Sequence, residues 1–335
     1  MPKQVILKTT LVLLFTIFTV FVYAVYRGSQ FLAAVNLSWT DISSAATSQI
    51  DQQKSHTFLI LGIGGSDHEG PNLTDTILLA SYNPHTHTLT SLSLPRDIWD
   101  TDTQDKINAT YTYALAQKVL DPSTYTRIKF ERITGLPIDH LVIIDFATFA
   151  KTIDILGGIE VQNDVAFTDP QYPIAGLENK DCIPFDVNYG CRYESVSFLK
   201  GPIQMSGPHA LKFVRSRHAV GDEGTDFARS HRQQLVLSAV AQKITKLITS
   251  IQLEPLTDLV EYLNSHISRT LSNKDALGYL FDIVVHRNSF HLSHLKIAED
   301  LLIVPPPAEY DGRYVLVPKD KKDSTLSAEI QKLLQ

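Results

Sequence analysis

Two arginines, Arg215 and Arg217, lie in residues 207–234, a stretch that reads GPHALKFVRSRHAVGDEGTDFARSHRQQ. In residues 211–217 apolar residues alternate with these arginines at a period of two, which predicts a strand with both guanidinium groups on one face. Guanidinium groups bind phosphates through paired hydrogen bonds. Two of them aimed at one place therefore indicate an anion site.

A helix is predicted shortly after this pair. Residues 226–248 (DFARSHRQQLVLSAVAQKITKLI) have amphipathic helical spacing, and Arg229, Arg232 and Gln233 stand at i, i+3 and i+4 near its start. We expect these three side chains to share one face. Helix N-termini favour anions, so this end of the helix is expected to contribute to the same anion site.

Electrostatic repulsion within this arginine cluster must be offset by negative charge, which leaves two interpretations. Two guanidinium groups about 7 Å apart repel by roughly 2.4 kcal/mol at an effective dielectric constant of about 20, and each further arginine adds to that cost. In one interpretation a phosphate or pyrophosphate relieves the repulsion. In the other, the arginines pair in a surface network with the acidic residues of the same stretch, which are Asp222, Glu223 and Asp226.

Asp75, Arg96 and Asp97 add charges of both signs. Asp75 opens a predicted strand after a loop rich in Gly, Asn and Thr, where a carboxylate can cap a turn or bind a hard cation such as Mg²⁺. Arg96 and Asp97 follow Pro95 at the end of the next strand, so we expect them at the same edge of the sheet. There Asp97 can hold the guanidinium group of Arg96 or contribute to the metal shell.

Length and charge limit the possible classes of protein. The chain has 335 residues and a formal net charge of -6. This length allows one large domain or two small ones. An acidic chain argues against general nucleic-acid binding, which usually needs a basic domain. The arginine cluster is therefore a local feature.

The N-terminus predicts a membrane anchor. Residues 9–26 are uncharged and mostly apolar, and as a helix they would span about 27 Å, close to the thickness of the hydrocarbon core. Lys3 and Lys8 precede this run, so we expect residues 1–8 in the cytoplasm, 9–27 in the membrane, 28–54 as a polar stalk and 55–335 as an extracytoplasmic domain. A cleaved signal peptide is the alternative, but the run is long for one and no A-x-A site follows it directly.

Cysteine usage agrees with an exported domain. Cys182 and Cys191 are the only two cysteines, and they lie nine positions apart in a loop rich in Pro, Asn and Gly. Outside the cytoplasm such a pair is expected to form a disulfide. Two cysteines without a nearby histidine pair do not complete a zinc site.

Predicted strands and helices alternate through the extracytoplasmic part. This order favours a three-layer α/β/α sandwich with a central mixed sheet. Residues 167–200 are expected to form a long irregular excursion. The predicted strands are 57–63, 75–82, 89–94, 141–144, 159–161 and 313–317, the second and third of them forming a hairpin; the predicted helices are 106–120, 123–134, 146–156, 226–248, 253–264, 274–282 and 325–334.

Five blocks follow one another along the sequence: LTDTILLASYNPHTHTLTSLSLPRD, DKINATY, IDILGGIEV, LKGPIQMSGPHALKFVRSRH and GTDFARSHRQQ. In this order they resemble the LytR-CpsA-Psr family of bacterial cell-wall glycopolymer ligases. The resemblance covers about residues 55–250 behind the single apolar segment. It implies an α/β/α sandwich and Mg²⁺-dependent phosphotransfer of a glycopolymer from a polyprenyl-pyrophosphate carrier to peptidoglycan.

The resemblance also assigns roles to individual residues. Asp75 in the TDT block resembles the magnesium ligand, and Arg96 in the PRD block resembles a pyrophosphate contact. By the same resemblance, the remaining phosphate-binding set of the family corresponds to Arg215, Arg217, Arg229 and Gln233 of this sequence, with Arg232 beside them. We expect Arg96, Asp97, Arg215 and Arg217 to take part in catalysis, and the helices predicted at 107–120 and 146–156 to wall a groove for the lipid tail.

One motif departs from the family pattern. The family usually carries G-x-D-x-R after the first strand, whereas here Gly62 is followed by Ile63, Gly64 and Gly65. Asp67 lies nearby but is displaced, and it is the candidate for a second metal carboxylate. Two alternatives therefore stand beside the phosphotransferase: a hydrolase that uses water as acceptor, and a non-catalytic envelope protein that binds or senses a lipid pyrophosphate.

Overall fold

The computed structural model describes residues 19, 22–23, 25–30, 32–33, 54–66, 68, 70–177, 180–182, 189–250, 252–298 and 300–334. Most of the predicted anchor and stalk, and also Asp67, lie outside these residues, so those predictions stay untested. Among the residues that are described, no helix is both long and apolar enough to cross a membrane.

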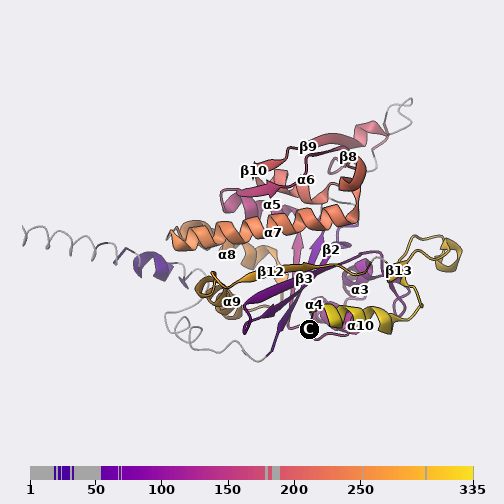
Figure 1. The fold of residues 1–335 in the computed structure, drawn as a ribbon, viewed down its shortest axis with the longest axis horizontal. Helices are drawn as coiled ribbons and strands as arrows, with labels where there is room; N and C mark the ends of the chain where they lie inside the picture. The colour runs from indigo at the N-terminus through magenta and orange to yellow at the C-terminus, as the bar shows by residue number, and fades with distance from the viewer. Residues whose placement is uncertain are drawn as a thin grey trace, which may run out of the picture.

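A six-stranded mixed sheet forms the centre of the domain (Figure 1), with the strand order β11-β6-β1-β2-β3-β12. The predicted hairpin is confirmed, because β2 pairs antiparallel with β3; β1 pairs antiparallel with β2 and parallel with β6. The strands are β1 (His56–Ile63), β2 (Thr74–Asn83), β3 (Thr88–Leu94), β6 (His140–Asp145), β11 (Ser268–Arg269) and β12 (His291–Leu295).

The main hydrophobic core lies on one face of this sheet. Alternate residues of the strands, such as Leu59, Leu61 and Leu79, are fully buried there. They pack against Phe130 of α4 (Pro122–Thr134) and Ile330 of α10 (Asp323–Leu334). These two helices form the first outer layer.

Other helices cover the opposite face. α5 (Phe146–Ile155), α6 (Gly207–Arg215) and α7 (Asp226–Thr249) lie together along it, as Figure 1 shows, with α8 (Glu254–His266) against α5 and α7. α9 (Asn273–Val285) covers the far end of the strands, where Tyr279 contacts Phe58 and Tyr82 edge to face. The predicted three-layer arrangement around a mixed sheet is therefore observed.

Smaller elements complete the fold. Residues 167–200 are not simply irregular, because they contain the antiparallel pair β8 (Phe167–Pro173) and β9 (Tyr193–Phe198). The predicted disulfide joins Cys182 to Cys191 between these strands. The remaining elements are β4 (Trp99–Asp100), β5 (Asp105–Lys106), β7 (Ile159–Asn163), β10 (Gly201–Met205), β13 (Leu302–Ile303), β14 (Val317–Pro318), α3 (Thr110–Ala116), η1 (Ile107–Ala109), η2 (Gly190–Arg192), η3 (Gly221–Gly224) and η4 (Pro307–Tyr310).

The strand predicted at 211–217 is wrong, because this segment continues helix α6 up to Arg215. Its buried residues Ala210, Phe213 and Val214 have helical spacing, and burial of that face outweighs the period-two alternation of the arginines. Gly207 starts the helix against α5, where a β-carbon would come within 1.9 Å of the Ala150 carbonyl oxygen. The absence of a side chain at Gly207 is what lets the two helices approach.

Two further predicted boundaries need correction. The helix expected at 106–120 is a 3-10 turn followed by the short α3, which ends at Ala116. The strand expected at 313–317 shrinks to β14, although Leu316 also forms a parallel bridge with Ile98. The other predicted helices and strands of the domain form within a few residues of their expected positions.

Candidate active site

A cavity of about 450 Å³ lies between the sheet and the layer of α5, α6 and α7. The strands present to it the residues that alternate with the main core, and the helices close it from the other side. Its apolar lining includes Ile60, Leu78, Val142, Ile144, Phe149, Leu211, Val214, Val236 and Leu237. Of the two helices expected to wall a lipid groove, α5 lines this cavity through Phe149, whereas no residue of 107–120 lines it.

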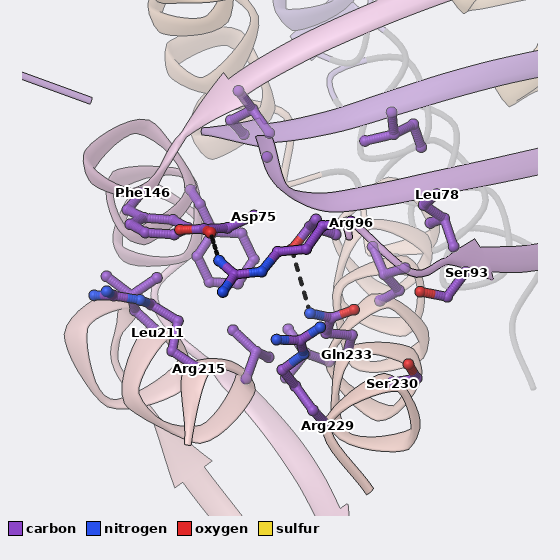
Figure 2. Close-up of a pocket in the computed structure, with 18 of the residues that line it drawn as sticks. Asp75, Leu78, Ser93, Arg96, Phe146, Leu211, Arg215, Arg229, Ser230 and Gln233 are labelled. Atoms are coloured by element: carbon purple, nitrogen blue, oxygen red, sulfur yellow. Dashed lines mark hydrogen bonds and ion pairs between the residues drawn. The ribbon is translucent and has the colours of Figure 1, made fainter. Parts of the chain in front are cut away.

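Charged side chains gather at one end of this cavity (Figure 2). Among the residues that the structure describes, four arginines and two aspartates line it, which gives these residues a formal excess of two positive charges. The structure thus brings together most of the residues predicted from the sequence, from β2, the turn after β3, the end of α6 and the turn after it, and α7. They are Asp75, Arg96, Arg215, Arg217, Arg229 and Gln233.

Asp75 and Arg96 form an ion pair across the β2–β3 hairpin, with their side chains 35% and 29% exposed. Arg96 Nε also lies 3.6 Å from a carboxylate oxygen of Asp97, which in turn binds Lys106 Nζ at 2.6 Å. Asp97 is not among the residues that line the cavity. Its position fits the holding of Arg96 rather than the catalytic role predicted for it.

Arg215 is oriented by aromatic rings. Its guanidinium carbon lies 4.2 Å from the centre of the Phe146 ring, and Nη1 donates to the Tyr172 hydroxyl at 3.4 Å. Burial raises the pKa of Tyr172, while the charge of Arg215 acts in the opposite direction. Tyr172 is therefore a neutral acceptor at ordinary pH.

Arg217 is positioned through its backbone. A carboxylate oxygen of Asp169 accepts the N–H groups of Arg217 and His218 at 3.0 and 3.2 Å. Asp169 is fully buried, so this pair of hydrogen bonds fixes the turn after α6 and directs Arg217 toward the cavity. Sequence analysis missed Asp169, because its partner lies 48 positions away.

Residues on α7 divide between two roles. Arg229 and Gln233 line the cavity, and Gln233 Nε2 donates to the Thr76 hydroxyl at 3.3 Å (Figure 2). Arg232 points elsewhere because positions i+3 and i+4 of a helix differ by about 100° in direction. The prediction that all three share one face is therefore wrong for Arg232.

Arg232 is a structural residue of the interior. Its side chain is 1% exposed and donates to the carbonyl oxygens of Phe213, Ser216 and Glu223 at 3.0, 2.6 and 3.0 Å. It also forms an ion pair of 2.9 Å with the Glu223 carboxylate. Burial lowers the pKa of Arg232, and Glu223 raises it. Of the acidic residues 222, 223 and 226, Glu223 is thus the partner of Arg232, and the pair lies in the interior rather than in a surface network.

Asp145 is a cavity residue that sequence analysis missed. It stands at the end of β6, opposite Ile63 at the end of β1, and caps α5 by accepting the Thr148 N–H at 2.6 Å. An aspartate at a strand end directly before a helix was the available signal. Asp75 and Asp145 are the two carboxylates in the cavity lining, and oxygen ligands of this kind suit Mg²⁺.

Comparisons with known proteins agree with this geometry. The model of the LytR_cpsA_psr family matches residues 23–320. A protein of Bacillus subtilis (strain 168), polyisoprenyl-teichoic acid–peptidoglycan teichoic acid transferase TagU, is 27% identical over 249 residues, which cover 70% of each chain. The solved structure of B. subtilis TagV is similar with a TM-score of 0.58 and 22% identity, over 84% of this chain and 98% of that chain. The LytR-CPS2A-psr family protein YwtF (TagT) with bound octaprenyl pyrophosphate lipid is similar with a TM-score of 0.53 and 22% identity, over 84% and 91%.

Proposed function

Since the chain belongs to the LytR-CpsA-Psr family, we propose that it is a membrane-anchored phosphotransferase that moves a glycopolymer from a polyprenyl-pyrophosphate carrier onto peptidoglycan. The observation that carries this proposal is the form of the cavity, which joins an arginine-lined end to an apolar interior. A pyrophosphate attached to an isoprenoid chain has the same division. The relative TagU is named as a transferase of this kind, and the YwtF (TagT) structure holds octaprenyl pyrophosphate.

Positioning and charge neutralisation are the main demands of phosphoryl transfer. Arg96, Arg215, Arg217 and Arg229 come from three separate segments, so they can surround a pyrophosphate rather than contact one side of it. In the proposed reaction a sugar hydroxyl of peptidoglycan attacks the glycan-linked phosphorus. The bond from that phosphorus to the bridging oxygen breaks, polyprenyl phosphate leaves with the electron pair, and the hydroxyl proton passes to the leaving phosphate or to water. The arginines stabilise the charge on the leaving phosphate.

Mg²⁺ is the cofactor that we propose for this site. The carboxylates of Asp75 and Asp145 fit it, because Mg²⁺ in proteins is commonly held by one or two carboxylates together with substrate phosphates. When bound, it would neutralise phosphate charge and polarise the reacting phosphorus. In the structure Asp75 pairs with Arg96 instead, so these two side chains must separate before Arg96 can contact a bound pyrophosphate and Asp75 can contact a cation.

The apolar part of the cavity is the proposed site of the lipid tail. It runs beneath the sheet residues Ile60 and Leu78 and the helix residues Val214 and Val236. Burial of isoprenoid surface there would contribute about 25 cal/mol of binding free energy per Å² of apolar area removed from water. The tail would therefore supply affinity, while the arginines supply specificity for the pyrophosphate.

An extracytoplasmic location, with the N-terminus in the cytoplasm, completes the proposal. The Cys182–Cys191 disulfide supports it, since such bonds persist in oxidising compartments. Alkylation of intact cells without reductant is the direct measurement. Two alkylated thiols per chain would contradict this location.

Turnover of a defined substrate tests the proposed activity. The full chain is incubated with an octaprenyl-pyrophosphate-linked oligosaccharide, Mg²⁺ and peptidoglycan fragments, and the products are identified by mass. We expect a phosphodiester between oligosaccharide and peptidoglycan, together with octaprenyl phosphate. Release of free oligosaccharide phosphate, not attached to peptidoglycan, would show a hydrolase. Binding of the lipid substrate without any product would show a non-catalytic lipid-binding protein.

A pair of variants on and next to α6 provides the control. Arg217→Ala removes a cavity arginine and should lower turnover by at least about tenfold, because a charge-assisted hydrogen bond contributes roughly 1.5–3 kcal/mol. Lys212→Ala removes a cation of α6 itself, which pairs with Glu194 at 2.8 Å and does not line the cavity. Equal losses in both variants would contradict the assignment of the cavity.

A further inference from the structure

Three metal-ligating side chains gather at the end of the sheet that is opposite the arginine-lined cavity. His87, Asp282 and His286 each offer a ring nitrogen or a carboxylate oxygen, and these atoms all lie within 4.8 Å of one another. β2 runs from Asp75 toward the turn that holds His87, and its eight steps to Asn83 span about 26 Å. The cluster is therefore separate from the proposed phosphotransfer site.

Two elements bring these side chains together. His87 ends the turn between β2 and β3 with a backbone φ of 51°, in the left-handed region. Asp282 and His286 are one helical turn apart at the end of α9, which lies at this end of the strands in Figure 1. The imidazole rings of His87 and His286 stack with their centres 3.8 Å apart and 13° between their planes, so one ring must turn about its side-chain torsions before both can offer an in-plane nitrogen to one ion.

The distances suit a small four-coordinate ion. In a tetrahedral zinc site with bonds of about 2.0–2.1 Å, neighbouring ligand atoms are about 3.3 Å apart. His286 Nδ1 lies 3.1 Å from Asp282 Oδ1, and His87 Nδ1 lies 3.8 Å from Asp282 Oδ2, so the observed separations fall on either side of that value. We propose that His87, Asp282 and His286 bind a divalent transition-metal ion of the zinc class, with water as the fourth ligand.

The surroundings of the cluster support this assignment. His87 Nδ1 is buried and has no hydrogen-bond partner among the described residues, a state that costs about 1–3 kcal/mol unless a ligand relieves it. The Asp282 side chain is 10% exposed and accepts a hydrogen bond from the Tyr82 hydroxyl, as ligating carboxylates usually do from an outer partner. The His286 side chain is 40% exposed, which leaves the ion a path of entry.

Ligand chemistry separates this site from the proposed magnesium site. Two imidazoles and one carboxylate favour zinc, copper or nickel, whereas Mg²⁺ prefers oxygen ligands alone. The ion would join the β2–β3 turn to α9. It would also fix the start of β12, because the His87 carbonyl oxygen accepts the His291 N–H at 3.0 Å. The expected consequence is a more stable sheet edge rather than a second reaction.

Direct metal binding tests the proposal. The full chain, purified without a polyhistidine tag and stripped with a chelator, is titrated with Zn²⁺ by calorimetry and with Co²⁺ by visible absorption. We expect one saturable ion per chain, intense tetrahedral Co²⁺ bands, a higher melting temperature with Zn²⁺, and no competition from Mg²⁺.

Matched variants assign the ligands. His87→Asn retains a residue that tolerates positive φ, and His286→Gln retains a polar side chain on α9. Each should weaken Zn²⁺ binding by at least about 100-fold, since even loss of an outer hydrogen bond costs roughly 10–100-fold. The loss of Zn²⁺ affinity in Tyr82→Phe should fall within that range of roughly 10–100-fold. His85→Asn, in the same turn but outside the cluster, should bind Zn²⁺ like the unaltered chain.

Three results would overturn the proposal. The first is the absence of saturable Zn²⁺ binding, and the second is binding that survives in both His87→Asn and His286→Gln. The third is a melting temperature that Zn²⁺ does not raise. Melting temperatures of all variants, measured in chelator, serve as the folding control. If His87→Asn or His286→Gln is unfolded in chelator, the Zn²⁺ titrations of Tyr82→Phe and His85→Asn take their place. Weaker binding in Tyr82→Phe alone then supports the site, and equal binding in both variants overturns it.

Discussion

Arg229 and Arg232 lie three positions apart on α7, yet the structure predicts opposite consequences for their removal. Arg232→Ala would leave the buried carbonyl oxygens of Phe213 and Ser216 without their charged donor, and would break the ion pair with Glu223. The loss of one member of a buried pair typically costs about 3–5 kcal/mol. At roughly 2 °C per kcal/mol for a domain of this size, the melting temperature should fall by about 6–10 °C.

Arg229→Ala should behave in the reverse way. Arg229 lines the positively charged end of the cavity, so its removal takes away a contact to the proposed ligand, while Arg232 still donates to the buried carbonyl oxygens of Phe213 and Ser216. We expect a melting temperature within about 2 °C of the unaltered chain. Affinity for octaprenyl pyrophosphate should fall by at least about tenfold, corresponding to roughly 1.5 kcal/mol for one charge-assisted hydrogen bond.

Thermal melting and lipid-pyrophosphate binding, measured on both variants, distinguish the two roles. Glu223→Gln is the matched control for Arg232, because an amide oxygen still accepts from the guanidinium group, and it should cost only about 1 kcal/mol. If Arg232→Ala kept the original melting temperature and lost lipid binding, Arg232 would be a phosphate ligand. The reasoning from its burial would then be refuted.

Three further predictions concern residues outside this pair. Asp169→Asn should lower both the melting temperature and the affinity for octaprenyl pyrophosphate. An amide group accepts from fewer of the N–H donors around Arg217, and each unsatisfied donor costs about 1–3 kcal/mol. Normal affinity in a destabilised variant would contradict this role of Asp169. Burial lowers the pKa of His140, so the unfolded chain takes up a proton before the folded one as the pH falls through about 6.5. The melting temperature should therefore drop between about pH 7.5 and pH 5.5, with a shallower drop in His140→Gln, and equal slopes would exclude His140 as the cause. Reduction of the Cys182–Cys191 disulfide should lower the free energy of unfolding by at most about 2.7 kcal/mol in the chain-entropy model, as measured by denaturant unfolding with and without reductant.

Local sequence patterns predicted the elements whose own residues determine their conformation. α7 formed where expected because its apolar residues recur at helical spacing, and the β2–β3 hairpin formed because two short apolar runs flank a tight turn. Segment 211–217 failed because its residues satisfy two periods, and the choice between them depends on the packing of Phe213 in the interior. The same limit applies to side-chain direction, since Arg232 and Gln233 differ in environment only once α6 lies beside α7.

Positioning residues were beyond sequence analysis for a different reason. The arginines were visible as a cluster along the chain, but the groups that orient them come from distant segments. Tyr172 contacts Arg215 across 43 positions, and Asp169 holds the backbone of Arg217 across 48. Such contacts leave no spacing in the sequence, because β8 approaches α6 only through the tertiary fold.

The ion pair of Asp75 with Arg96 links the two halves of the proposed site. Both side chains are about one-third exposed, so the pair contributes little to the free energy of unfolding and can open without disturbing the core. A pyrophosphate that takes Arg96 as its partner leaves the Asp75 carboxylate available for a cation, and a cation at Asp75 leaves Arg96 available for a phosphate. The ligand that binds first therefore breaks the ion pair of Asp75 with Arg96, and the second ligand binds without that cost. The proposed metal and lipid pyrophosphate are expected to bind cooperatively, while Asp97, itself paired with Lys106, keeps Arg96 in place.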